Sequence, residues 1–350
     1  MGLCGRISKG FARPALGIAC LAFASASQVA ASQTVADRGF DAGRLADAVA
    51  QARALERLDT LILARDGEIA FAESFRGRGL DAPVNVKSVS KSIIAALVGI
   101  AIDKEILAGP DQTIGTLFGD RIPEGADPRV AGITVGNLLS MQAGLERTSG
   151  RNYGRWVQSR DWVAHALSRP FVDAPGGGML YSTGSSHLLS AILTRASGHS
   201  TLDLARDWLG NPLGIEIPAW DRDPQGIYFG GNNMALSPRA LLQFGELYRR
   251  GGDVDGRRIL PEAWVQTSWT PRTRSVFSGD GYGYGWFLRD VGGGRMAAYA
   301  RGFGGQYVIV IPSLAMTIVI ISDTDTRLRV DGYGDALWSM VEDALIPAAR

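Results

Sequence analysis

Segments with the residue pattern of β-strands lie near both ends of this 350-residue chain, whereas helical patterns fill most of the middle. Strands are expected at 58–64, 68–75, 285–290, 295–299, 306–311 and 314–322. Helices are expected at 41–55, 134–141, 161–167, 186–196, 237–250 and about 334–346. This order predicts an α/β (α+β) fold, in which an antiparallel sheet built from both chain ends is flanked by helices and joined to a mostly helical second domain.

Residues 1–31 are expected to be a secretory signal peptide rather than part of the fold. Three basic residues precede an apolar run at 15–24, and small residues suit cleavage after Ala26 or Ala31. We therefore expect an exported protein, either periplasmic or secreted. Both cysteines, Cys4 and Cys20, lie within this segment, so the mature chain would have neither a disulfide nor a thiolate site.

The remaining chain, 33–350, is predicted to be one domain made of two interleaved parts. The sheet part comprises about 40–87 and 237–350, and the helical part about 88–236. The 36 basic and 35 acidic residues are scattered, which argues against nucleic acid as a partner. We expect no integral membrane segment in the mature chain, because the longest apolar stretch, 308–321, is interrupted by Pro312-Ser313.

The apolar segment 86–101 contains the most informative pair of polar residues. Lys91 follows Ser88 by three positions, so in a helix both side chains lie on one face. Ser88 could be an N-cap, but a capping box would place Glu or Gln, not Lys, three residues later. Burial and the positive end of the helix dipole would both lower the pKa of Lys91. A neutral lysine one turn from a serine hydroxyl predicts an activated nucleophile.

Other nucleophile and metal chemistries have little support in the sequence. There is no Gly-x-Ser-x-Gly motif, and His165, His187 and His199 lack metal-ligand spacing, so we expect structural histidines and neither metal nor cofactor. Besides Lys91, Tyr181 is a candidate base, because a neighbouring cation lowers the pKa of a phenol. Alternatively, Tyr181 is a half-buried ring whose hydroxyl bonds a backbone carbonyl.

Three motifs, in this order, resemble the serine β-lactamase-related family: Ser88-Val-Ser-Lys91, the segment 133–145 (ITVGNLLSMQAGL), and Tyr181-Ser-Thr-Gly. That family holds class C β-lactamases, D-alanyl-D-alanine peptidases, and esterases and amidases such as 6-aminohexanoate-dimer hydrolase. The likeness extends from about 40 to 345, and segments 181–198, 231–238 and 302–306 resemble the hydrolase and esterase branch. The resemblance implies a β-lactamase/transpeptidase-like fold with its site in the groove between the two parts.

The resemblance also implies a serine hydrolase that cleaves a small ester, a linear amide or a peptide-like substrate through an acyl-enzyme on Ser88. Lys91 and Tyr181 would take the serine proton, and Tyr181 would return a proton to the leaving group. Backbone N–H groups of Ser88 and of Phe303, directly after Gly302, would stabilise the oxyanion.

Two departures from the family pattern affect substrate binding. The Tyr-x-Asn motif ends here in Thr183, which lacks the amide that helps to hold a β-lactam. The Lys-Thr-Gly motif is Ala300-Arg301-Gly302, which lacks the cation that faces the β-lactam carboxylate. Thr183, Arg301 and Gly302 remain candidate substrate-binding residues. Arg301 either replaces the lysine as an anchor for an acidic group or is a solvent-facing strand residue.

Two alternative functions remain open at this point. One is β-lactamase or D-Ala-D-Ala carboxypeptidase activity, which the two departures make doubtful. The other is a non-catalytic relative that binds peptidoglycan or a peptide in the same groove. The presence of Ser88, Lys91 and Tyr181 together argues against this second alternative.

Overall fold

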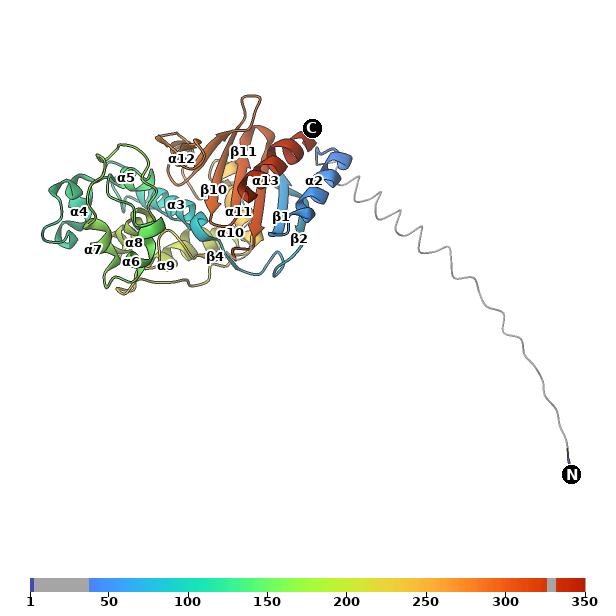
Figure 1. Cartoon of the computed structure of the whole chain (residues 1–350), viewed down its shortest axis with the longest axis horizontal. Coiled ribbons are helices and arrows are strands. Elements are labelled where there is room, and N and C mark those ends of the chain that lie inside the picture. Colours follow the sequence, from blue (N-terminus) through green and yellow to red (C-terminus); the bar gives the residue numbers. More distant parts are fainter. Residues whose placement is uncertain (3–37, 326–331, 350) are drawn as a thin grey trace.

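The computed structural model describes residues 1–2, 38–325 and 332–349. The predicted signal peptide, apart from its first two residues, lies outside these ranges. Figure 1 shows a sheet at one side of the molecule and a helical part at the other, with helix α3 (Ser90–Asp103) between them. The sheet strands come from both ends of the chain, and the helical part comes from its middle.

An eight-stranded antiparallel sheet is the largest element of the described residues. Its order is β2 (Glu68–Ser74), β1 (Leu58–Arg65), β12 (Met316–Ser322), β11 (Gln306–Ile311), β10 (Met296–Gly302), β9 (Phe287–Asp290), β8 (Gly281–Tyr282) and β7 (Thr273–Arg274). Strands from the start and the end of the chain therefore meet inside one sheet. This arrangement of an antiparallel sheet with many helices confirms the predicted fold class.

The apolar stretch 308–321 forms a hairpin of β11 and β12, as predicted. A 3₁₀ turn at Pro312–Leu314 separates the strands, and Ala315 leaves the turn with a left-handed φ of 50°. Every residue of both strands is buried. The reason is that the hairpin lies inside the sheet and helices cover both of its faces.

Each face of the sheet has its own core. On one face, α2 (Ala42–Ala54) and α13 (Tyr333–Ser339) lie side by side (Figure 1) and share a core with Leu61 of β1. On the other face, α3 and α11 (Pro238–Arg249) share a core with Ile62. Successive residues of a strand thus enter opposite cores, as the two-residue period of a β-strand requires.

The helical part consists of short helices around the longer α8 (Thr183–Ser197). They are α4 (Ile114–Phe118), α5 (Val135–Leu139), α6 (Tyr153–Val157), α7 (Trp162–Leu167), α9 (Thr201–Ala205) and α10 (Asn211–Leu213). The remaining elements are the strand pairs β3 (Val84–Asn85) with β4 (Ala235–Leu236) and β5 (Asp253–Val254) with β6 (Arg257–Arg258), the helices α12 (Glu262–Ser268) and α14 (Ile346–Ala348), and π-helical turns at Arg206–Gly210 and Met340–Leu345. None of the helices in the described ranges combines the length and apolar character that crossing a membrane requires.

Several helices and strands begin or end at residues other than those predicted. The helix predicted at 134–141 ends at Leu139, and Met141 has a left-handed φ of 62°. The strand predicted at 285–290 begins at Phe287, because Gly285 has a φ of 78°. The helix predicted at 186–196 begins earlier, at Thr183. The strand pairs β3–β4 and β5–β6 were not predicted, because two residues are too few to show an alternating pattern.

Gly245 allows α11 to lie close to the sheet, and replacing it tests this packing. A Cβ at Gly245 would lie 2.6 Å from Thr317 Cγ2 and 2.9 Å from Val308 Cγ1, both on stiff β-branched side chains. We expect Gly245→Ala to lower the free energy of unfolding by about 1–3 kcal/mol through overpacking. Urea unfolding followed by circular dichroism measures the change.

The matched control is Gly154→Ala, at an exposed position of helix α6 where a Cβ would meet nothing within 4 Å. Alanine is favoured over glycine within a helix, so this control should be neutral or slightly stabilising. If Gly245→Ala were as stable as the control, α11 would not depend on this close approach.

Candidate active site

Ser88 lies in a 3₁₀ turn, Lys87–Val89, directly before α3. Lys87 N–H donates to Asn85 Oδ1 (2.9 Å), and Ser90 Oγ donates to the Lys87 carbonyl (2.6 Å). These bonds hold Lys87 at a left-handed φ of 51°, which is uncommon for a residue with a Cβ. Val89, not Ser88, occupies the N-cap position of α3. The Ser88 hydroxyl is therefore not used as a helix cap.

Lys91 lies in the first turn of α3, and its amine is surrounded by oxygen atoms. The Nζ atom donates to the Gly231 carbonyl (2.6 Å) and lies 3.0 Å from Ser88 Oγ and 3.4 Å from Thr183 Oγ1. Lys91 is only 3% exposed. Burial lowers its pKa to about 7, because the charged form loses its hydration. At neutral pH a large fraction of Lys91 is therefore neutral and able to accept a proton.

Tyr181 lies two residues before α8 and covers the amine. Lys91 Nζ lies 5.0 Å from the centroid of the Tyr181 ring. Burial raises the pKa of Tyr181 to about 12, against smaller opposing effects of the Ser88 hydroxyl and the Arg301 guanidinium. A neighbouring cation was expected to lower this pKa, but burial reverses the net direction. Tyr181 is thus a protonated phenol at neutral pH, suited to donate a proton.

Thr183 is the first residue of α8, and its hydroxyl lies between Lys91 and Ser149. Thr183 Oγ1 is 2.9 Å from Ser149 Oγ, which also accepts the Thr183 N–H at 2.9 Å. Thr183 is 5% exposed. The structure therefore brings this predicted residue next to the Ser88–Lys91 pair, with its hydroxyl facing protein groups more than solvent.

The segment that supplies the Gly231 carbonyl is held against α8. A Cβ on Gly231 would lie 2.8 Å from Ser186 Cβ and 3.1 Å from Thr183 Cγ2, so glycine permits this approach. Nearby, Met234 N–H donates to Ser90 Oγ at 3.2 Å. In the sequence this segment is recognisable only by its resemblance, and its contact with Lys91 could not be predicted, because a backbone acceptor leaves no pattern of residue types.

His187, within α8, helps to hold the same segment. Its Nε2 lies 3.0 Å from Asp223 Oδ2, and Gly230 N–H donates to its Nδ1 at 3.4 Å. Because Nδ1 accepts this hydrogen bond, Nε2 is the ring nitrogen that donates to Asp223. Asp223 Oδ1 also accepts the N–H groups of Gln225 and Ile227. His187 is fully buried and has the structural role expected from the sequence.

The end of β10 forms the opposite wall. A Cβ on Gly302 would overlap the Val86 carbonyl oxygen, so glycine lets β10 lie against the segment before Ser88. Phe303 follows in the turn to β11, and its backbone N–H donates to no acceptor among the described residues. Ser88 and Phe303 line the same cleft. This arrangement suits an oxyanion hole made from their two N–H groups.

The cleft has a volume of about 580 Å³, within the range of about 300–1,000 Å³ that is typical of small-molecule sites. It brings together six predicted residues, Ser88, Tyr181, Thr183, Arg301, Gly302 and Phe303, while Lys91 is buried behind Ser88. Other lining residues were not predicted from the sequence, among them Arg147, Ser149, Tyr153 and Phe277. Asn232 also lines the cleft, and although it belongs to the segment 231–238 that carries the resemblance, the resemblance gives it no role.

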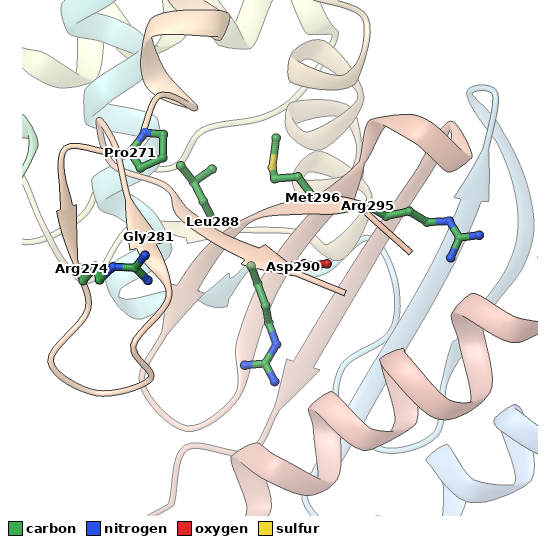
Figure 2. A pocket seen from close by; sticks show the side chains of 9 residues that line it. Pro271, Arg274, Gly281, Leu288, Asp290, Arg295 and Met296 are labelled. Carbon is green, nitrogen blue, oxygen red and sulfur yellow. The ribbon is translucent and has the colours of Figure 1, made fainter. Parts of the chain in front are cut away.

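A second hollow, of about 410 Å³, lies along strands β8, β9 and β10 and is shown in Figure 2. Pro271, Leu288 and Met296 line it, with Arg274 and Arg295 toward its two sides. Its lining, as far as the structure describes it, contains no serine, cysteine, histidine or lysine. Within the described ranges, no group of three or more His, Cys, Asp or Glu residues could hold a metal ion. The Ser88 cleft is therefore the candidate active site.

Comparison with known proteins identifies the family of this chain. Residues 46–338 match the model of the Beta-lactamase family. The 6-aminohexanoate-dimer hydrolase of Paenarthrobacter ureafaciens is 25% identical over an alignment of 297 residues, and the match covers 77% of this chain and 74% of that protein.

Solved structures share the fold. A putative 6-aminohexanoate-dimer hydrolase from Bacillus anthracis matches with a TM-score of 0.70 and 19% identity, covering 82% of this chain and 78% of its own. EstCE1, a hydrolase with promiscuous acyltransferase activity, matches with a TM-score of 0.68 and 19% identity, covering 89% and 99% of the two chains. The resemblance inferred from the motifs is confirmed, and the chain belongs to the Beta-lactamase family.

Proposed function

We propose that this protein is an exported serine hydrolase that cleaves an ester or a linear amide through an acyl-enzyme on Ser88. The observation that carries the proposal is the 3.0 Å distance between Ser88 Oγ and the Lys91 amine, whose pKa is about 7. At this distance a neutral amine can remove the hydroxyl proton while the oxygen attacks a carbonyl.

Each protein group has a defined part in acylation. Lys91 takes the proton of Ser88 as Oγ bonds to the carbonyl carbon, and the N–H groups of Ser88 and Phe303 stabilise the oxyanion. Tyr181 donates its proton to the departing oxygen or nitrogen and is reprotonated by the Lys91 ammonium. The leaving group departs neutral and Lys91 is neutral again. Water then gives a proton to the same amine as its oxygen attacks the acyl carbon. The bond to Ser88 Oγ breaks, the Lys91 ammonium returns the proton to Oγ, and the acid is released.

The residues that replace two family motifs support esters and linear amides over β-lactams. Thr183 offers a buried hydroxyl, already 2.9 Å from Ser149, where the family has an asparagine amide. Ala300 offers no cation where the family has a lysine. The names of the similar proteins, a 6-aminohexanoate-dimer hydrolase and a hydrolase with promiscuous acyltransferase activity, support the same substrate preference.

Ser88→Ala should abolish labelling by a fluorophosphonate and hydrolysis of short-chain nitrophenyl esters, with an unchanged circular dichroism spectrum. Peptide mapping by mass spectrometry locates the label, and Ser168→Ala, at an exposed serine after α7, is the matched control. A label on Ser90 or Ser92 would mean that the nucleophile is misassigned. Absence of labelling in the unmodified protein would favour the non-catalytic alternative. Rapid turnover of a chromogenic cephalosporin would contradict the proposed preference for esters and linear amides over β-lactams.

The pH dependence of kcat/KM tests the assignment of the base. Because Lys91 must be neutral, kcat/KM should rise with pH through about 7 and then level off. Tyr181→Phe should keep this transition, because the pKa of Tyr181 is about 12. Either Tyr181→Phe or Lys91→Ala should lower the plateau roughly a hundredfold or more.

Because both groups act on one proton path, the effects of Lys91→Ala and Tyr181→Phe should not add. Full additivity in the double variant would show that the two groups act independently. Loss of the transition near pH 7 in Tyr181→Phe would assign the base to the tyrosine instead.

Export is proposed from the sequence of the first 31 residues. N-terminal sequencing of protein recovered from outside the cytoplasm should find a chain that starts after Ala26 or Ala31. A chain that starts before residue 20, or one with a lipid on Cys20, would contradict this cleavage.

A further inference from the structure

Arg301 is a cation at the edge of the proposed site that has no partner among the described residues. Its half-buried side chain lines the cleft, and within the described ranges it forms neither an ion pair nor a hydrogen bond. Other partly buried arginines of the sheet part are paired, such as Arg289 with Glu342 and Arg249 with Glu246. Partial burial disfavours an unpaired charge, so Arg301 is suited to an anion that the substrate brings.

Arg147 is a second cation of the cleft and lies on the wall that the helical part forms. It is exposed and lines the cleft, and no described carboxylate pairs with it. The adjacent Glu146 instead binds Arg169 and Arg151. The cleft therefore presents one guanidinium from each wall.

The rest of the described lining of the cleft contains no acidic residue to balance these two charges. It consists of aromatic rings, of hydroxyl and amide groups, and of glycine. Tyr153, Phe277, Phe287 and Phe303 supply the rings. A cleft that carries only positive charges between apolar walls attracts anions and repels ammonium groups.

The two arginines face different halves of the substrate. The Tyr181 ring stacks on Phe287 of β9 with 6.2 Å between the ring centroids, and β9 pairs with β10, the strand that contains Arg301. Tyr181 therefore lies against the wall that carries Arg301, and the Arg301 guanidinium also opposes the rise in the pKa of Tyr181. Since Tyr181 is the proposed donor to the leaving group, Arg301 belongs to the leaving-group half. Arg147, on the other wall, is then placed at the acyl half.

We propose that the cleft selects substrates whose acyl chain ends in a carboxylate, bound by Arg147, and that Arg301 accepts a second negative charge on the leaving group. This inference rests on the proposed function and adds a substrate class to it. An acyl chain with a terminal ammonium, like the acyl half of 6-aminohexanoate dimer, would be disfavoured. Anionic esters or amides with a hydrocarbon spacer would be favoured, because the guanidinium forks bind carboxylates and the rings bind the spacer.

Nitrophenyl esters of matched length test the acyl half. The 4-nitrophenyl esters of hexanoate, adipate and 6-(trimethylammonio)hexanoate differ only in the end of the acyl chain. We expect kcat/KM to be highest for the adipate ester, about tenfold above the hexanoate ester, and lowest for the cationic ester. Added salt should reduce the preference, because screening weakens exposed charge interactions. The rate measured with the Ser88→Ala variant is subtracted from each rate as the background hydrolysis.

Two variants test the roles of the two arginines separately. Arg147→Gln should remove the preference for adipate over hexanoate. Arg301→Gln should instead remove a preference for 3-carboxy-4-nitrophenyl hexanoate over 4-nitrophenyl hexanoate. The matched control is Arg257→Gln in β6, at an exposed arginine that forms no ion pair with a described residue and does not line the cleft. This control should leave both preferences unchanged.

The outcomes distinguish this inference from the proposed function. If none of the esters is hydrolysed in a Ser88-dependent way, the proposed function itself fails. If hexanoate is hydrolysed but adipate is no better, or the cationic ester is equally good, the function stands and the charge selection is wrong. The same holds if Arg147→Gln retains the adipate preference.

Discussion

Moving an amine out of water disfavours its charged form, and Lys91 is in this position without a described carboxylate nearby to compensate. Its burial depends on three separate parts of the chain. The Ser88 turn, the start of α8 and the segment around Gly231 each provide one oxygen atom within 3.4 Å of Nζ. All three belong to the helical part, at positions far apart in the sequence, so that part must be folded along its whole length before this environment exists. The reactivity of Ser88 is therefore a property of the folded helical part rather than of one motif.

Close backbone approaches hold these parts together. Gly231 lets its segment touch α8, and Gly302 lets β10 reach the Val86 carbonyl just before Ser88. At Gly231 the nearest atoms are Ser186 Cβ and Thr183 Cγ2, whereas at Gly302 the nearest atom belongs to the backbone. The approach of β10 to the segment before Ser88 therefore depends on a glycine and a backbone carbonyl rather than on the side chains that line the cleft.

The sequence predicted the antiparallel sheet, its origin in both chain ends, and the candidate pair Ser88 and Lys91, because these depend on local periodicity and short spacing. It did not predict what depends on distant contacts. The Gly231 carbonyl and Arg147 in the cleft carry no recognisable pattern. The direction of the Tyr181 pKa could not be predicted either, because it depends on how deeply the folded chain buries the ring.

The meeting of the chain ends has a consequence for how this molecule forms. Strand β1 lies between β2 and β12, and Asp41 N–H donates to the Ala348 carbonyl at 2.8 Å. A ribosome releases the first strand long before the last. During that interval β1 has an unpaired, strongly apolar edge, which is the kind of surface that causes aggregation. Native structure can therefore arise only after synthesis is complete, and until then the nascent chain needs protection from its own copies.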